Sequence, residues 1–154
     1  MTKYAADTSV SAERTLSEIQ GMLKRYGATR MGYAEDAQHV EVAFEMHGRR
    51  VRFNMPLPDK HDDQFVAKRN GRYTQKGNLN HSAYEQAVRS KWRALLLAIK
   101  AKLESVESQI ETFDEAFMAQ LVLPSGETMG KWAVPQIAAT YESGGMPPML
   151  TDGG

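Results

Sequence analysis

The chain of 154 residues contains no cysteine, which excludes disulfide bonds, thiolate metal sites and cysteine nucleophiles. It also contains no apolar run approaching the roughly 18 to 20 residues that a membrane-spanning helix requires. The first residues, MTKYAADTSVSAER, lack the apolar segment of a signal peptide. We therefore expect a cytoplasmic protein that does not engage a membrane.

Catalytic signatures are missing as well. The sequence has no Walker loop, no GxGxxG, no HExxH and no GxSxG. His61, Asp62 and Asp63 offer metal-ligand atoms, but on one loop, whereas a metal site needs ligands from several converging elements. These observations predict a protein that is not an enzyme and that holds no metal or cofactor.

The formal net charge is zero, yet the charges are segregated along the chain. Residues 1–48 contain five Lys/Arg and seven Asp/Glu, residues 49–102 contain thirteen and four, and residues 103–154 contain one and eight. A strongly basic central part favours an anionic partner such as nucleic acid. The alternative is that folding brings the acidic and basic parts together, so that they neutralise each other.

The spacing of apolar residues predicts a single α+β domain over residues 1–144. Residues 12–26 place apolar side chains at intervals of four and three, which is one face of a helix that Ser9 or Ser11 caps and Gly27 ends. A strand over 29–35 and a hairpin over 40–55 form a three-stranded antiparallel sheet. A long helix and C-terminal helices follow, and residues 145–154 form a tail.

The hairpin has a sequence-defined register. If His47 and Gly48 form a two-residue turn, apolar residues face each other on one side in the pairs Phe44–Val51, Val42–Phe53 and Val40–Met55. On the other side Glu45 faces Arg50, as an ion pair. Arg52 faces Ala43 and is predicted to be the cation without a partner.

Residues 60–81 form a predicted flexible loop between the sheet and the long helix. The segment is polar, contains two glycines and shows no sustained hydrophobic period. Four cations surround one aromatic residue, a composition that suits contacts to phosphates and bases as well as a solvated flap: Lys68, Arg69, Arg72 and Lys76 around Tyr73.

The long helix, over residues 82–110, has an apolar stripe and a second stripe of small residues on the opposite side. The alanines of the second stripe would allow another helix to approach closely, and they are the candidates for self-association: Ala87, Ala94, Ala98 and Ala101. The small-residue stripe has two alternative interpretations. The C-terminal helices of the same chain could cover it, or alanine is present for its helix propensity.

The remainder is predicted to be helical. Thr112 and Glu115 have the spacing of a capping box, which starts a short helix. LVLPSGET is typical of an extended piece and a turn. Thr128 then caps a final helix through Tyr141, kinked or delayed at Pro135.

Three stretches resemble a family of small proteins encoded in tailed-phage and prophage genomes. They are YGATRMGY (26–33), the hairpin continuing into FNMPLP, and the segment WRALLLAIKAKLESVESQIETFDEAFMAQLVLPSGETMGKWAVPQI (92–137). Because no activity or functional residues are established for the family, the resemblance implies no functional residue in this chain. The resemblance implies a bacterial host cell as the setting. Small non-enzymatic phage proteins often handle DNA or RNA, or block a host-defence complex.

Together these features predict a non-enzymatic phage-type accessory protein that binds nucleic acid or a nucleoprotein complex, for example as a host-defence inhibitor such as an anti-CRISPR. The expected anion-binding residues are Arg52, Lys68, Arg69, Arg72, Tyr73, Lys76, Arg89 and Arg93. One alternative is a protein-only inhibitor or assembly module, a homodimer joined through the long helix. A second alternative is a sponge for small signalling nucleotides, with the basic loop closing over a pocket.

Overall fold

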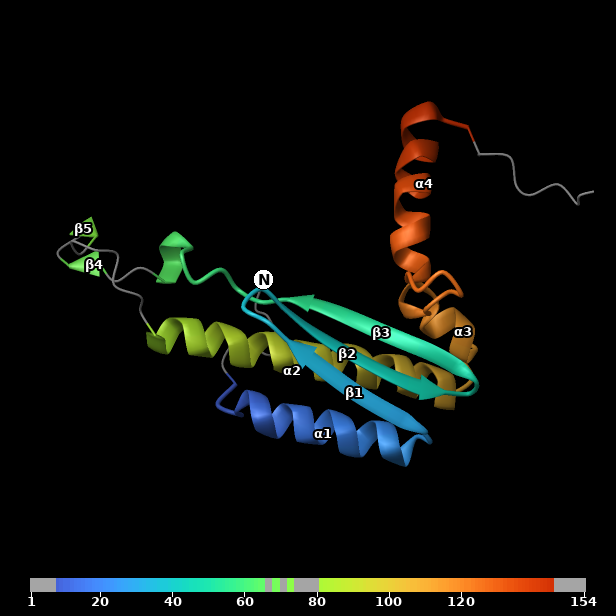
Figure 1. Cartoon of the computed structure of the whole chain (residues 1–154), viewed down its shortest axis with the longest axis horizontal. Helices are drawn as coiled ribbons and strands as arrows, with labels where there is room; N and C mark the ends of the chain where they lie inside the picture. Colours follow the sequence, from blue (N-terminus) through green and yellow to red (C-terminus); the bar gives the residue numbers. More distant parts are fainter. Residues whose placement is uncertain (1–7, 66–67, 70–71, 74–80, 146–154) are drawn as a thin grey trace, which may run out of the picture.

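The computed structural model describes residues 8–65, 68–69, 72–73 and 81–145 (Figure 1). The fold is α+β, as the sequence predicts. Along the chain the elements are α1 (Ala12–Arg25), β1 (Arg30–Glu35), β2 (His39–Met46), β3 (Arg49–Pro56), η1 (Asp63–Phe65), β4 (Lys68–Arg69), β5 (Arg72–Tyr73), α2 (His81–Glu107), α3 (Phe113–Ala116), η2 (Met118–Gln120) and α4 (Met129–Ser143).

Helix α1 begins and ends where its sequence predicts. The Ser11 hydroxyl accepts a hydrogen bond from the Arg14 amide at 3.2 Å, which satisfies one of the open donors of the first turn. After the last turn, Gly27 has a φ of 100°, a conformation that glycine adopts without strain. Ile19 and Leu23 on the apolar face are fully buried.

The sheet has the order β1-β2-β3 and is antiparallel throughout. The predicted hairpin register is confirmed, with Phe44 paired with Val51, Val42 with Phe53 and Glu45 with Arg50. His47 and Gly48 both have positive φ, 52° and 69°, as a tight hairpin turn requires. The register therefore buries one face of the sheet and leaves the other to solvent.

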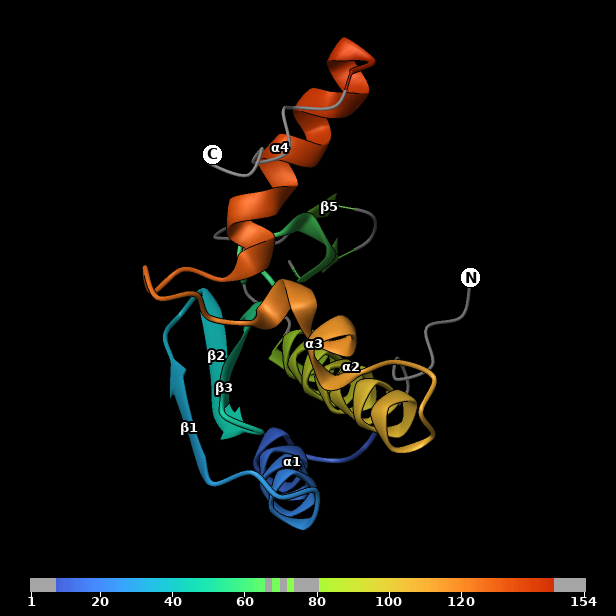
Figure 2. The ribbon, with the colours of Figure 1, turned by 90° about the vertical axis from the view of Figure 1, so that its right-hand side faces the viewer.

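The core lies between the sheet and the helices α1 and α2, which cover one face of the sheet (Figure 2). The short C-terminal elements close the core at the hairpin end. Phe117 is completely buried there, with its ring centroid 5.8 Å from that of Phe44 and 6.3 Å from that of Phe53, both in edge-on geometry. Such edge-to-face aromatic contacts add to the hydrophobic stabilisation.

The predicted capping box that starts α3 is present. Thr112 accepts a hydrogen bond from the Glu115 amide, while the Glu115 carboxylate accepts one from the Thr112 amide. Leu121 then forms an isolated bridge with Val51, and this contact joins the C-terminal part to the free edge of β3.

Helix α4 leaves the rest of the molecule as a projecting arm (Figures 1 and 2). Thr128 caps its start, as predicted, and Gly144, with a φ of 72°, ends it. Pro135 lies inside the helix and does not delay it. At the base, Gly130 packs so closely on η2 that an added Cβ would lie 2.9 Å from the Ala119 carbonyl oxygen.

Part of the predicted basic loop has regular structure. Strands β4 and β5 form a two-residue ladder that pairs Lys68 with Tyr73 and Arg69 with Arg72. Lys76 and most of the predicted 145–154 tail lie outside the described residues. Within the described residues, no helix combines the length and apolar character needed to cross a bilayer.

Candidate interaction surfaces

Arg52, predicted to be the cation without a partner, is engaged twice, and that prediction is wrong. Its Nε lies 3.7 Å from Oε1 of Glu41, and its Nη2 donates a hydrogen bond of 2.9 Å to the Gly126 carbonyl oxygen. Glu41 is the diagonal neighbour of Arg52 across the β2–β3 pair, within reach of a long side chain. Arg52 therefore holds the 121–128 segment onto the sheet and leaves only 29% of its side chain exposed.

The two predicted cations of the long helix are also engaged within the molecule. Nη1 of Arg93 lies 2.8 Å from Oε2 of Glu18 on α1, and 27% of the Arg93 side chain is exposed. Arg89 donates through Nη2 to the side-chain oxygen of Gln86. This edge of α2 therefore joins α1 and α2 and does not form an open track of cations.

Two hairpin arginines have carboxylate partners too. Arg50 lies 3.7 Å from Glu45, as the register predicts. Arg49 donates two hydrogen bonds to Asp114, at 2.9 and 3.0 Å, and ties the hairpin to α3. The hydrogen bond from Arg49 lowers the pKa of Asp114 below its usual value and raises the pKa of Arg49. Internal neutralisation therefore applies to Arg49, Arg50, Arg52 and Arg93.

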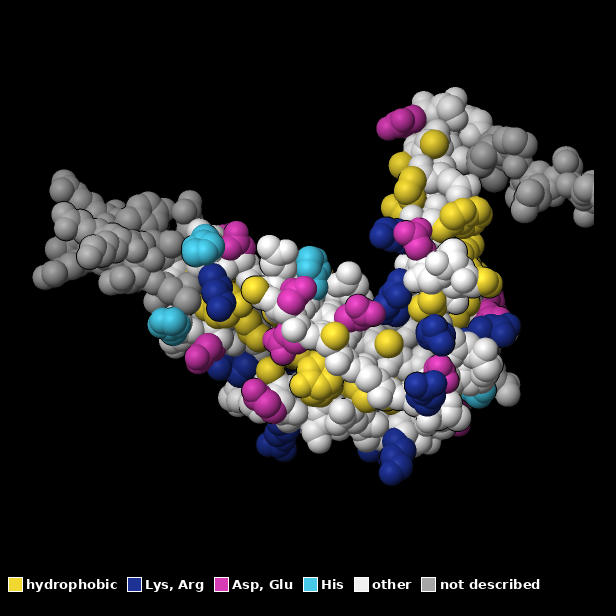
Figure 3. Space-filling model, in the orientation of Figure 1, with side chains coloured by type: hydrophobic (Ala, Val, Ile, Leu, Met, Phe, Trp, Pro, Cys, Tyr) yellow, Lys and Arg dark blue, Asp and Glu magenta, His cyan; other side chains and the backbone are white. Residues whose placement is uncertain are grey.

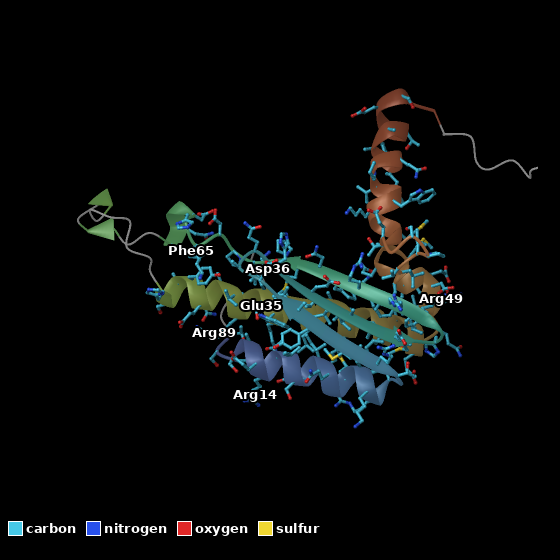
Figure 4. The ribbon with its side chains drawn as sticks, in the orientation of Figure 1. Arg14, Glu35, Asp36, Arg49, Phe65 and Arg89 are labelled. Atoms are coloured by element: carbon cyan, nitrogen blue, oxygen red, sulfur yellow. The ribbon has the colours of Figure 1, made fainter. Side chains whose placement is uncertain are left out.

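The carboxylates that neutralise these cations come mainly from an unexpected part of the chain. Glu18, Glu41 and Glu45 belong to the first 48 residues, and only Asp114 belongs to the acidic last third. In Figure 4, Arg49 lies beside α3, at the opposite end of the molecule from Arg89. Of the predicted anion-binding residues, Arg52 is held against the 121–128 segment, whereas Arg93 is held against α1, so these two belong to different surfaces.

The basic ribbon, which we define as strands β4 and β5, contains four of the predicted anion-binding residues. Its ladder brings Lys68, Arg69 and Arg72 beside Tyr73 on four paired positions. In the segment before the ribbon, the Lys60 ammonium lies 5.4 Å from the centroid of the Tyr84 ring on α2, a cation–π arrangement.

The small-residue stripe of α2 is not covered by the C-terminal helices. Ala94, Ala98 and Ala101 are exposed, and Ala87 is half-buried. The predicted alternative in which these helices fill the stripe is therefore wrong. Self-association through this face stays a prediction.

The apolar arm, which we define as α4, is the surface that the sequence reasoning missed. Hydrophobic side chains run along it in Figure 3. Trp132, Val134, Ile137 and Tyr141 are 52%, 60%, 52% and 85% exposed, and no residue of α4 is buried. The spacing of three and four between Val134, Ile137 and Tyr141 on an almost uncharged helix predicts an apolar stripe, but this spacing does not say whether the stripe is buried or exposed.

Within the residues that the structure describes, the arm packs against the body at its base. The Thr128 cap, the contact of Gly130 with η2 and half-buried Met129 and Ala133 all belong to the start of the helix. Isolated helices shorter than about 12 to 15 residues are marginal in water, and helices in proteins are mostly stabilised by packing of their apolar face. The upper part of α4 has no such packing against the described part of the chain.

No group of three or more metal-ligating side chains gathers within the described residues. Comparison of the chain with protein-family models, with curated proteins and with solved structures returned no match. Function is therefore argued from the surfaces described above.

Proposed function

We propose that the chain is a non-enzymatic protein-binding module that engages an apolar surface of another protein through α4. The observation that supports this proposal is an apolar helix that packs on the folded body at its base and projects from it over the rest of its length. Large exposed apolar patches on proteins are typical of interaction sites. A helix laid against an apolar partner surface is a recurrent recognition mode, read from anchors spaced three and four residues apart.

The charge of the arm favours a protein over other partners. Lys131 and Glu142 are the charged residues of α4. Nucleic-acid binding depends on clustered cations that neutralise phosphates, and amphipathic helices that bind membranes carry Lys and Arg along a polar face. The arm has neither, whereas Trp and Tyr are enriched at protein interfaces.

The phage resemblance gives this proposal a setting. A small module with an apolar arm would act as an inhibitor or assembly factor by occupying a surface of a host-defence or phage complex. This corresponds to the protein-only alternative of the sequence analysis, with α4 in place of the long helix as the binding element.

Site-specific photocrosslinking tests the proposal. A photoreactive residue at position 137 on the arm should capture one protein from the host cell, identified by mass spectrometry. The same residue at position 20 on α1 is the matched control, because Gln20 is also exposed on a helix and belongs to no proposed interface. With the purified partner, Ile137→Asp should weaken binding by about tenfold or more, since it puts a charge at a desolvated anchor. Equal capture from both positions, or unchanged affinity of the variant, would contradict the proposal.

The basic ribbon supports a second candidate function, binding of nucleic acid. Three cations and a tyrosine on four paired positions suit phosphate and base contacts. The replacement of Lys68, Arg69 and Arg72 by glutamine should weaken binding to labelled single-stranded DNA or RNA and reduce its salt dependence. Arg52→Gln is the matched control and should leave the affinity unchanged, because this arginine is used internally.

A further inference from the structure

We propose that α4 pairs in antiparallel orientation with α4 of a second copy of this chain. This inference rests on the proposed function, because it names a partner for the same arm. It arises from the distribution of apolar and charged residues around the helix, and from the position of the arm relative to the body.

The large side chains Val134, Ile137 and Tyr141 of the arm occupy one side of the helix. At 100° per residue, Val134, Ile137, Ala138 and Tyr141 fall within about 100° of one another around the helix axis. The opposite side carries, from the base outward, Trp132, Gln136, Ala139 and Ser143. A one-sided stripe suits a helix partner, while an enclosing groove would contact apolar residues on several sides.

The stripes of two antiparallel α4 helices can pack against each other. If the two-fold axis passes beside Ile137 and Ala138, Val134 of one helix meets Tyr141 of the other. The small alanine beside the axis leaves room for the isoleucine of the partner helix. Such alternation of large and small side chains fills the contact between two helices.

The two-fold axis that pairs the stripes also brings opposite charges of the two helices together. Lys131 and Glu142 lie near opposite ends of α4, and they differ by only about 20° around the axis. In the antiparallel pair each lysine therefore lies within a turn of the partner's Glu142, on the same flank. A parallel pair would place Lys131 and the partner's Glu142 at opposite ends and on opposite flanks, so this attraction would be absent. Lys131 also lies 3.4 Å from Glu127 of its own chain, and the partner's Glu142 would join this pair on the same flank. The charges thus favour the antiparallel arrangement.

The position of the arm leaves room for this pairing. α4 contacts the body at its base, where Gly130 packs on η2, and its remaining length projects away from the body (Figure 1). Reversal of the second helix puts the two bodies at opposite ends of the paired arms. A contact of one helix pair belongs to the interfaces that bury less than about 1,200 Å², so we expect a weak dimer in rapid exchange with the monomer.

Because the chain has no cysteine, disulfide trapping with single introduced cysteines tests the pairing. Ile137→Cys, close to the two-fold axis, should form a covalent dimer under mild oxidation about tenfold or more faster than a chance collision allows, since pairing raises the local thiol concentration. Gln136→Cys is the matched control, one residue away on the opposite side of the helix. Val134→Cys and Tyr141→Cys should crosslink poorly alone and readily when mixed.

Each outcome decides the inference. Equal crosslinking of the position 136 and position 137 cysteines would overturn it, as would a wild-type chain that sediments as a monomer at the highest soluble concentration. Self-crosslinking of Val134→Cys and Tyr141→Cys alone would show parallel pairing and would also overturn it. Capture of a foreign protein at position 137 without any dimer would leave the proposed function intact, so the two failures are distinguishable.

Discussion

The body and the arm of this molecule use apolar residues in opposite ways. In the body, the alternation along β2 and β3 and the stripes of α1 and α2 bury their apolar side chains against one another. In α4, side chains of the same types remain exposed, and the helix is defined by its cap, its closing glycine and one close contact at its base. The comparison teaches that capping residues and one contact at its base can define a helix whose apolar side chains remain exposed and able to bind a partner.

The largest expected difference is between a buried phenylalanine of the body and an exposed isoleucine of the arm. Phe117→Ala should destabilise the protein by about 3 to 5 kcal/mol, because it removes a completely buried ring and leaves a cavity. Ile137→Ala should cost less than about 0.5 kcal/mol, as surface substitutions usually do. Urea denaturation of dilute protein, followed by circular dichroism, measures both. Similar losses from the two variants would show that the arm packs against the body.

Substitution of one glycine at the base of the arm and of one in the body compares how tightly the two regions are packed. Gly130→Ala should destabilise the protein by about 1 kcal/mol, because overpacking against a backbone atom exceeds the gain in helix propensity. Gly21→Ala in α1 is the matched control and should stabilise by about 0.5 to 1 kcal/mol, since its new Cβ would meet only the end of the Arg25 side chain. Thermal denaturation distinguishes the two signs. If Gly130→Ala stabilised the protein, the contact between α4 and η2 would have to widen at little cost in free energy.

The smallest effect concerns the ion pair that ties the hairpin to α3. The pKa of Asp114 is lowered in the folded protein, so the contribution of its ionised form is present above the unfolded pKa, about 3.9. That contribution is lost as the pH falls through the folded pKa. Asp114→Asn should therefore lower Tm at neutral pH, and the difference from the wild type should shrink in acid.

Arg49 provides the control for this pH dependence. In an Arg49→Gln background, Asp114→Asn should change Tm little at any pH, because the two residues form one interaction. A pH-independent loss in both backgrounds would assign the effect to something other than the ion pair.

The sequence predicted the elements that depend on residues close to one another in the chain. The hairpin register follows from strict alternation around His47 and Gly48, because a slip by one residue would reverse both faces. The caps at Ser11, Thr112 and Thr128 follow from short-range hydrogen bonds, which need no tertiary information.

The contacts that remained unpredicted span long stretches of chain. Arg52 reaches Gly126, and Arg93 reaches Glu18. Each depends on how helices and strands pack, which no local pattern encodes. The projection of α4 was also missed, because an exposed apolar stripe and a buried one have the same spacing in the sequence. Only the position of the helix distinguishes them.

Hydrogen exchange of the α4 amides tests the central claim most directly, that the apolar stripe of the arm is stabilised by a partner and not by the body. In dilute isolated protein, amides beyond residue 133 should exchange far faster than those of α2, and they should become protected when the protein is concentrated or its partner is added. Amides of α4 that are as slow as those of α2 in dilute protein would contradict the account.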